Sequence, residues 1–159
     1  MFKDLSLQAT YSSYEDNLGD LFYSPVLAQS VRYDRATAYF SAKALANYAK
    51  GLECFAQNGH TMRLIVSAEI DKEDYFQIQD GYALRATIRE ELVARMRETL
   101  SLEEERNISN LAYLVGLGVI DIKVAFTQEG IFHDKFGIVE DAEGNIICFR
   151  GSNNETAAE

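Results

Sequence analysis

The stretch IFHDKFGIVE, residues 131–140, is followed by DAEG, residues 141–144, and then by NIICFR, residues 145–150. Its two flanks are rich in β-branched and aromatic residues, which favour β-strands. The short polar segment between them has a glycine at its end, as hairpin loops often do. The stretch therefore predicts a β-hairpin with strands at 131–140 and 145–150.

Folding this hairpin about the midpoint of its loop gives one expected register. The pairs are Glu140 with Asn145, Ile138 with Ile147, Phe136 with Phe149, Lys135 with Arg150, and His133 with Ser152. Because directly opposed residues share one face of a sheet, the two apolar pairs predict a core face. The other face is expected to carry the polar residues His133, Lys135, Arg150 and Ser152. A one-residue bulge at Gly144 would shift this register.

The polar face has the groups that suit a phosphodiester. His133 and Lys135 are two positions apart on the expected strand, so they project from one face about 7 Å apart. An imidazole can attack phosphorus or donate a proton, while an ammonium and neutral donors hold the phosphoryl oxygens. Lys135 and Arg150 would repel each other across the hairpin, and a bound phosphate would relieve that repulsion. The pattern predicts a phosphate site.

Ordinary explanations exist for each part of this pattern. A lone His-x-Lys in a strand is common and usually has no catalytic role. Ser152 suits a turn, and Asn154 suits the N-cap of a following helix. The occurrence of both motifs at a hairpin-matched distance favours the phosphate site over these explanations.

The two motifs resemble the signature of the phospholipase D superfamily, His-x-Lys-x-x-x-x-Asp followed by Gly-Ser-x-Asn. The matching positions are His133, Lys135, Gly151, Ser152 and Asn154. The acidic position falls on Glu140 instead of Asp, with Asp141 next to it. The resemblance implies a phospholipase-D-like fold, in which the acidic residue supports the site more than the chemistry.

The resemblance also implies a mechanism. One histidine forms a covalent phosphohistidine, a second histidine protonates the leaving oxygen, and water resolves the intermediate. Lysine and asparagine neutralise the developing charge, so no metal or other cofactor is implied. Since this chain has one copy of the motif, the resemblance to single-motif members implies a homodimer. The implied catalytic residues are His133, Lys135, Ser152, Asn154 and Glu140, and the phosphate-binding residues are Lys135, Arg150, Ser152 and Asn154.

The run from Gly151 to Thr156 resembles phospholipase-D-like domains attached to bacterial helicases and restriction-type enzymes. This implies a DNA substrate and a domain that belongs to a longer protein. The position of the last residue, soon after the second motif, is consistent with a piece of such a protein. Relatives carry a further Glu about ten residues past the Asn, and here Glu155 and Glu159 are the available candidates for orienting the histidine.

Composition limits the function classes. A chain of 159 residues fits one domain, and 47% hydrophobic with 25% charged residues is typical of a soluble globular protein. The net charge of −10 disfavours broad non-specific nucleic-acid binding but leaves room for a local basic groove. No apolar run approaches about 18 residues, and the N-terminus lacks a signal-peptide core. Cys54 and Cys148 in apolar contexts predict buried thiols in a reducing cytoplasm.

The rest of the chain predicts alternating helices and strands. A helix is expected within 16–29, a strand at 32–40, and a helix capped by Ser41 and ended by Gly59. The strand at 61–68 has a continuous apolar middle, which predicts burial on both faces. A loop or short helix at 71–81, a helix over 84–100, a helix at 107–117 and a strand at 120–126 follow. The order predicts an α/β fold with a mixed sheet flanked by helices on both faces.

Two other functions compete with a nuclease. The domain could be a non-catalytic DNA-binding or dimerisation module of a helicase or restriction-type protein, as Glu140 and the acidic pI suggest. Alternatively, a metal site could use His133, Asp134, Glu140 and Asp141. Alternation along a strand disfavours the metal site, because Asp134 would point away from His133.

Overall fold

The structure is a computed structural model of the chain, and it describes residues 1–12, 14–100, 107–130 and 132–151. Short helices alternate with strands in the amino-terminal half, longer helices follow, and a hairpin ends the described chain. In order, the elements are η1 (Phe2–Asp4), η2 (Gly19–Tyr23), α1 (Ser24–Leu27), β1 (Ser30–Thr37), η3 (Ala42–Tyr48), α2 (Ala49–Gln57), β2 (Met62–Ser67), α3 (Lys72–Arg85), α4 (Glu90–Glu98), α5 (Asn107–Gly116), β3 (Ile120–Ala125), β4 (Phe136–Asp141) and β5 (Ile146–Arg150).

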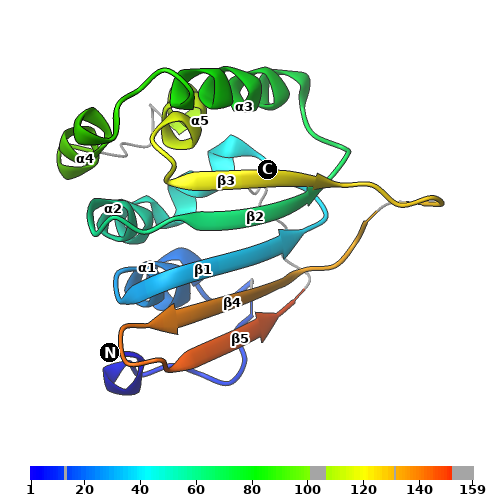
Figure 1. Cartoon of the computed structure of the whole chain (residues 1–159). Coiled ribbons are helices and arrows are strands. Elements are labelled where there is room, and N and C mark those ends of the chain that lie inside the picture. Colours follow the sequence, from blue (N-terminus) through cyan, green and yellow to red (C-terminus); the bar gives the residue numbers. More distant parts are fainter. Residues whose placement is uncertain (13, 101–106, 131, 152–159) are drawn as a thin grey trace.

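The strands form one mixed sheet in the order β3-β2-β1-β4-β5 (Figure 1). Strands β1, β2 and β3 run parallel, whereas β4 is antiparallel to both β1 and β5. The carboxyl ends of the three parallel strands therefore lie at the same edge as the amino end of β4. The prediction of an α/β fold with a mixed sheet is confirmed. In open α/β sheets, ligands bind outside the carboxyl ends of the strands.

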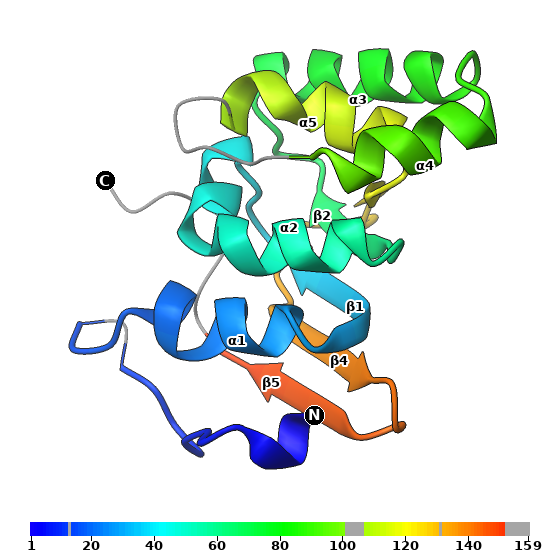
Figure 2. The same cartoon turned by 90° about the vertical axis from the view of Figure 1, so that its left-hand side faces the viewer.

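Only one face of the sheet is covered by helices of the described chain. Figure 2 shows α1 and α2 on one side of the strands. Along β2, Met62, Leu64 and Val66 are at most 1% exposed, whereas Ile65 between them is 44% exposed. The prediction of helices on both faces was therefore wrong, as was burial of β2 on both faces. A continuous apolar run does not establish that both faces of a strand are buried. In β2, the apolar side chain of Ile65 lies on the open face.

The edge of the sheet at β3 is covered by helix α3. The Tyr82 hydroxyl accepts a hydrogen bond from the backbone N–H of Ile122 (2.9 Å) and donates to the Asp121 carboxylate (2.5 Å). The Arg85 guanidinium donates to the backbone oxygen of Ile120 (2.8 Å). These side chains occupy backbone groups that an edge strand would otherwise present to another strand.

The β4–β5 hairpin exists as predicted, but its strands are shorter and its register differs by one residue. Strand β4 begins at Phe136, not at residue 131, and Gly137 pairs with Phe149 where Phe136 was expected to. The reason is the turn, in which Gly144 has a φ of +77° and donates its N–H to the Asp141 oxygen. Asp141 then pairs with Asn145, so a glycine bulge shifts every later pair.

The register shift exchanges the two faces of the hairpin. Val139, 1% exposed, and the half-buried pair Ile147 and Phe149 face the core. Phe136 is 42% exposed, and Ile138 also lies on the open face. The prediction that Phe136 and Ile138 belong to the core was therefore wrong, since a one-residue slip turns each side chain to the opposite side of the sheet.

Helix boundaries follow the capping signals more closely than the apolar stripe. Ser41 accepts from the Lys43 N–H (3.3 Å) at the start of η3, as predicted, and Asp71 accepts from the Glu73 N–H (2.8 Å) at the start of α3. The single helix expected over 84–100 is instead the end of α3 followed by α4. Thr87 donates its hydroxyl to the Leu84 oxygen (2.8 Å) at the break, a local bond that competes with helix continuation.

Within the described chain, none of the helices is both long enough and apolar enough to cross a bilayer.

Candidate functional site

The first motif lies at the edge of the sheet where the parallel strands end. His133 and Lys135 precede β4 and lie beside the carboxyl end of β1. They were predicted to belong to a strand, and they do not. The backbone oxygen of Lys135 accepts from the N–H of Gly151 (3.4 Å), which continues the β4–β5 register by one position. The motif is thus fixed by the hairpin behind it and opens toward the sheet edge.

His133 and Lys135 meet directly. The Lys135 Nζ lies 2.8 Å from Nε2 of His133 and 3.3 Å from the His133 backbone oxygen. The ring of Tyr39 approaches the imidazole edge-on, with 6.2 Å between the ring centroids and 83° between the planes. Lys135 is 8% exposed, whereas His133 is exposed. A buried ammonium therefore supports an imidazole that remains open to solvent.

The contact has one chemically consistent direction. An ammonium has donors and no acceptor, so it donates to His133, whose Nε2 is the acceptor. The neutral imidazole tautomer that fits this contact has its proton on Nδ1 and its lone pair on Nε2. This nitrogen is the one that a nucleophilic histidine would use, and the ammonium next to it is aligned to hold an anion.

Arg150 was expected to oppose Lys135, and this was wrong. Arg150 pairs with Phe136 and is exposed, so it lies on the open face of the sheet, away from the buried Lys135. The repulsion expected between the two cations does not arise in this register. The one-residue shift at Gly144 accounts for the difference.

Arg35 of β1 is the cation that shares the helix-covered face with Lys135. It is 3% exposed, it pairs with Gly137 of β4, and its guanidinium carbon lies 5.2 Å from the centroid of the Phe149 ring. Gly137 makes this stack possible, because a Cβ there would come within 2.1 Å of the Phe149 ring.

Sequence reasoning missed Arg35 and Tyr39. Arg35 lies two positions after Tyr33, which is fully buried, and two before Thr37, which is also fully buried. Period-two alternation from Tyr33 would have indicated that a charged side chain points to the core. Tyr39 follows the end of β1 by two residues, and no pattern in the sequence indicates that its ring contacts that of His133.

Glu140 does not reach the site. It is five residues from Lys135 along the chain, about 17 Å in a strand, and it lies on the open face, where its carboxylate is 3.7 Å from Arg32. No contact between Glu140 and His133 or Lys135 is present among the described residues, so its place among the catalytic residues stays a prediction. Glu140 was expected on the face opposite His133, and it lies on the face opposite Lys135, the motif residue next to β4.

Asp141 instead supports the hairpin. Its carboxylate accepts from the backbone N–H groups of Phe2 (2.9 Å), Glu143 (3.0 Å) and Asn145 (2.9 Å), and from the Asn145 amide (2.9 Å). Burial would raise the pKa of Asp141, but these hydrogen bonds outweigh it and lower the pKa to about 2. The acidic residue that organises this segment is one position beyond the expected one.

Several predicted residues fall outside this description or differ from it. Ser152 and Asn154 of the second motif lie outside the described residues, as do Glu155 and Glu159. Cys148 is exposed on the open face and Cys54 is half-buried, so the expectation of two buried thiols was wrong. Among the described residues, no three His, Cys, Asp or Glu side chains gather in a way that could hold a metal ion.

His60 is remote from the motif. It lies just before β2, at the opposite edge of the sheet, so the length of β2 separates it from the carboxyl edge by about 20 Å. Its ring packs 5.5 Å from that of Phe55, and burial followed by the nearby Arg97 lowers its pKa.

Comparisons with known proteins found no match for this chain among protein-family models, curated proteins or solved structures.

Proposed function

We propose that this protein is a metal-independent phosphodiesterase that cleaves DNA through a phosphohistidine intermediate. The observation that carries the proposal is the contact between His133 and Lys135 at the carboxyl edge of the parallel strands, with the lysine buried and the imidazole exposed. The resemblance of the two motifs to the phospholipase D superfamily supports the same chemistry. Cytoplasmic residence and attachment to a helicase or restriction-type protein belong to this proposal.

The proposed reaction starts at Nε2 of His133. Its lone pair attacks phosphorus, an N–P bond forms, and the P–O bond to the leaving oxygen breaks. The Lys135 ammonium turns from the imidazole to the phosphoryl oxygens, where charge develops. A general acid protonates the leaving oxygen, and water then cleaves the N–P bond to release the phosphate monoester and free imidazole. Ser152 and Asn154 are proposed as further donors to the phosphate.

The general acid is proposed to come from a second copy of the chain. His60 lies at the opposite edge of the sheet from His133, so it is too distant to protonate a leaving group there. A two-fold axis through the sheet edge would bring two His133 side chains to one phosphate. The proposal therefore includes a homodimer.

The test is cleavage of single- and double-stranded DNA in excess EDTA by the wild-type protein and by His133→Ala. We expect cleavage by the wild type and a loss of at least about 10³-fold in the variant. The matched control is His60→Ala, which removes the other histidine and should leave the rate unchanged. Full activity of His133→Ala, or a requirement for added metal, would contradict the proposal.

A second candidate function is a non-catalytic DNA-binding or dimerisation module. It is favoured by the open face of the sheet, on which Ile65, Phe136 and Ile146 are 44%, 42% and 59% exposed. Exposed apolar side chains gathered on one sheet face are typical of an interaction surface. Binding of DNA in EDTA without any cleavage by the wild-type protein would favour this candidate.

A further inference from the structure

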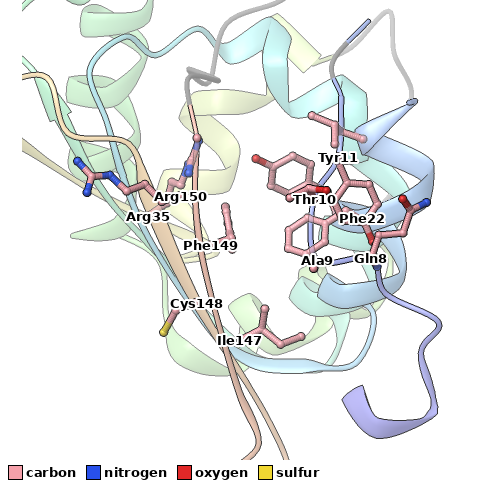
Figure 3. A pocket seen from close by; sticks show the side chains of 13 residues that line it. Gln8, Ala9, Thr10, Tyr11, Phe22, Arg35, Ile147, Cys148, Phe149 and Arg150 are labelled. Carbon is pink, nitrogen blue, oxygen red and sulfur yellow. The ribbon is translucent and has the colours of Figure 1, made fainter. Parts of the chain in front are cut away.

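A cavity of about 390 Å³ lies beside the candidate site, on the helix-covered side of the hairpin (Figure 3). One wall is formed by β5 and by Arg35 of β1. The opposite wall is the segment 8–11, and η2 with the preceding Leu18 contributes the remainder. The volume lies within the range of small-ligand sites, which is about 300–1,000 Å³.

Aromatic rings dominate the lining. Phe22 packs edge-on against Phe149 (5.0 Å between centroids) and is tilted against Tyr11 (5.6 Å), while Tyr23 packs edge-on against Phe149 at 5.8 Å. Phe22 is 8% exposed and belongs to the core. Tyr11, Tyr23 and Phe149 are half-buried, so parts of these rings face the cavity. Figure 3 shows the rings of Tyr11 and Phe22 facing β5 across the opening.

The charge of the lining differs from that of the chain. The protein has 25 acidic and 15 basic residues, yet no Asp or Glu is among the described residues that line this cavity. Arg35 supplies the cation on this side of the sheet, whereas Arg150 borders the cavity from β5 with its side chain on the open face. The Arg35 guanidinium therefore gives one wall of the cavity a cationic group beside the Phe149 ring. Aromatic faces beside a guanidinium group suit a ligand that is flat and carries an anionic group.

The cavity ends next to the candidate phosphate site. Gly151 lines the cavity and donates its N–H to the Lys135 oxygen (3.4 Å), so the two sites share a backbone contact. Adjacent strands are about 5 Å apart, which places the end of the cavity one strand spacing from Lys135. A ligand whose anionic group contacts Lys135 can thus place a neighbouring ring in the cavity.

We propose that this cavity binds the nucleobase next to the scissile phosphate, so that the substrate is a single-stranded nucleic acid. The proposal rests on the function proposed above and adds the strand preference to it. A base inside a duplex is stacked and paired, and it has to leave the helix before it can enter a cavity. Tyr11 and Phe149 contact the base in a manner that tolerates different bases, because each base has a π-face.

The test uses His133→Ala protein, which prevents cleavage, and a short single-stranded oligothymidylate in which one nucleotide at a time is abasic. At one position, loss of the base should weaken binding by about 5- to 150-fold. Tyr11→Ala should remove the dependence on that base. The matched control is Tyr75→Ala, which removes an exposed tyrosine on α3 outside the cavity and should keep the dependence.

A second measurement does not depend on any variant of the cavity. Photo-crosslinking of wild-type protein to an oligonucleotide with 5-bromodeoxyuridine at the sensitive position should label the tryptic peptide 4–32, which contains Tyr11 and Tyr23. Affinity that is equal at all abasic positions, equal affinity for duplex and single strand, or crosslinks confined to other peptides would overturn the proposal.

The two proposals fail in different ways. Cleavage by the wild type with binding that no abasic position affects overturns the base cavity alone. A base-dependent affinity without cleavage by the wild type supports the cavity and overturns the phosphodiesterase.

Discussion

The charged side chains at the two ends of the β4–β5 hairpin differ in their hydrogen-bond partners. At the turn, the Asp141 carboxylate accepts hydrogen bonds from three backbone N–H groups and from one side-chain amide. At the open end, both acceptors of the Lys135 ammonium within the described residues belong to His133, whose ring is exposed. A charge whose hydrogen bonds are all internal stabilises the fold, whereas a charge that can exchange its partner for a ligand is suited to chemistry.

Among the variants that compare the two ends of the hairpin, the largest effect is expected from Lys135→Met, which keeps the length of the side chain and removes its charge. Cleavage of DNA should fall by at least about 10²-fold, because the ammonium is proposed to stabilise the charge on phosphorus. The melting temperature should stay the same or rise, since a buried charge is replaced by an apolar group of similar size. Kinetics and thermal unfolding of the same sample measure both.

The control for this variant is Lys123→Met, which changes an exposed lysine on the open face of the sheet. It should alter neither property. A wild-type rate in Lys135→Met would contradict the proposed role of Lys135 in the chemistry. A large fall in the melting temperature of this variant would show that Lys135 supports the fold.

At the other end of the hairpin, Asp141→Ala should lower the melting temperature more than any other variant considered. It leaves the N–H groups of Phe2, Glu143 and Asn145 without their acceptor. The rate per folded molecule, measured well below the melting temperature, should be retained. Glu143→Ala, an exposed residue of the same turn, is the control and should melt close to the wild type.

Gly137→Ala tests the connection between the two ends. The added Cβ would lie 2.1 Å from the Phe149 ring, so the ring has to move. The free energy of unfolding should therefore fall by about 1–3 kcal/mol. Combining it with Phe149→Leu should restore part of the loss, because a smaller side chain leaves room for the methyl group. Equal stability of Gly137→Ala and the wild type would contradict the close approach of ring and backbone.

The smallest effect is the pH dependence of the Asp141 contribution. The folded pKa of about 2 lies below the ordinary value of 3.8, so the carboxylate stabilises the fold above about pH 4. This contribution is lost as the pH falls through the folded pKa. The difference in melting temperature between wild type and Asp141→Asn should therefore narrow between about pH 4 and pH 2. A constant difference over that range would assign the stabilisation to another group.

The hairpin, the order of strands and helices and the mixed sheet were all predictable from the sequence, because each depends on local patterns. Ser41 was identified as a cap and functions as one. The register was not predictable to one residue, since it depends on whether Gly144 adopts a positive φ within the turn. The turn at Gly144 decides whether Phe136 or Gly137 pairs with Phe149, and whether Arg150 lies opposite Lys135.

For the candidate site, the sequence identified His133 and Lys135 and predicted that they act together, which agrees with their contact. It did not identify Arg35 or Tyr39, because neither belongs to the motif. Each is recognised from a tertiary contact, Arg35 from its pairing with Gly137 of β4 and Tyr39 from its ring contact with His133. It chose Glu140 over Asp141 on motif spacing alone. Which of the two carboxylates supports the hairpin depends on the N–H groups around the turn. One of these N–H groups belongs to Phe2, at the other end of the chain.

Tyr82 and Arg85 occupy the Ile122 N–H and the Ile120 oxygen at the β3 edge of the sheet. We therefore expect a strand from another molecule to extend this sheet beside β5. Self-association by strand addition would therefore begin at the hairpin that carries the candidate site, and conditions that promote fibres or swapped dimers should also alter access to His133.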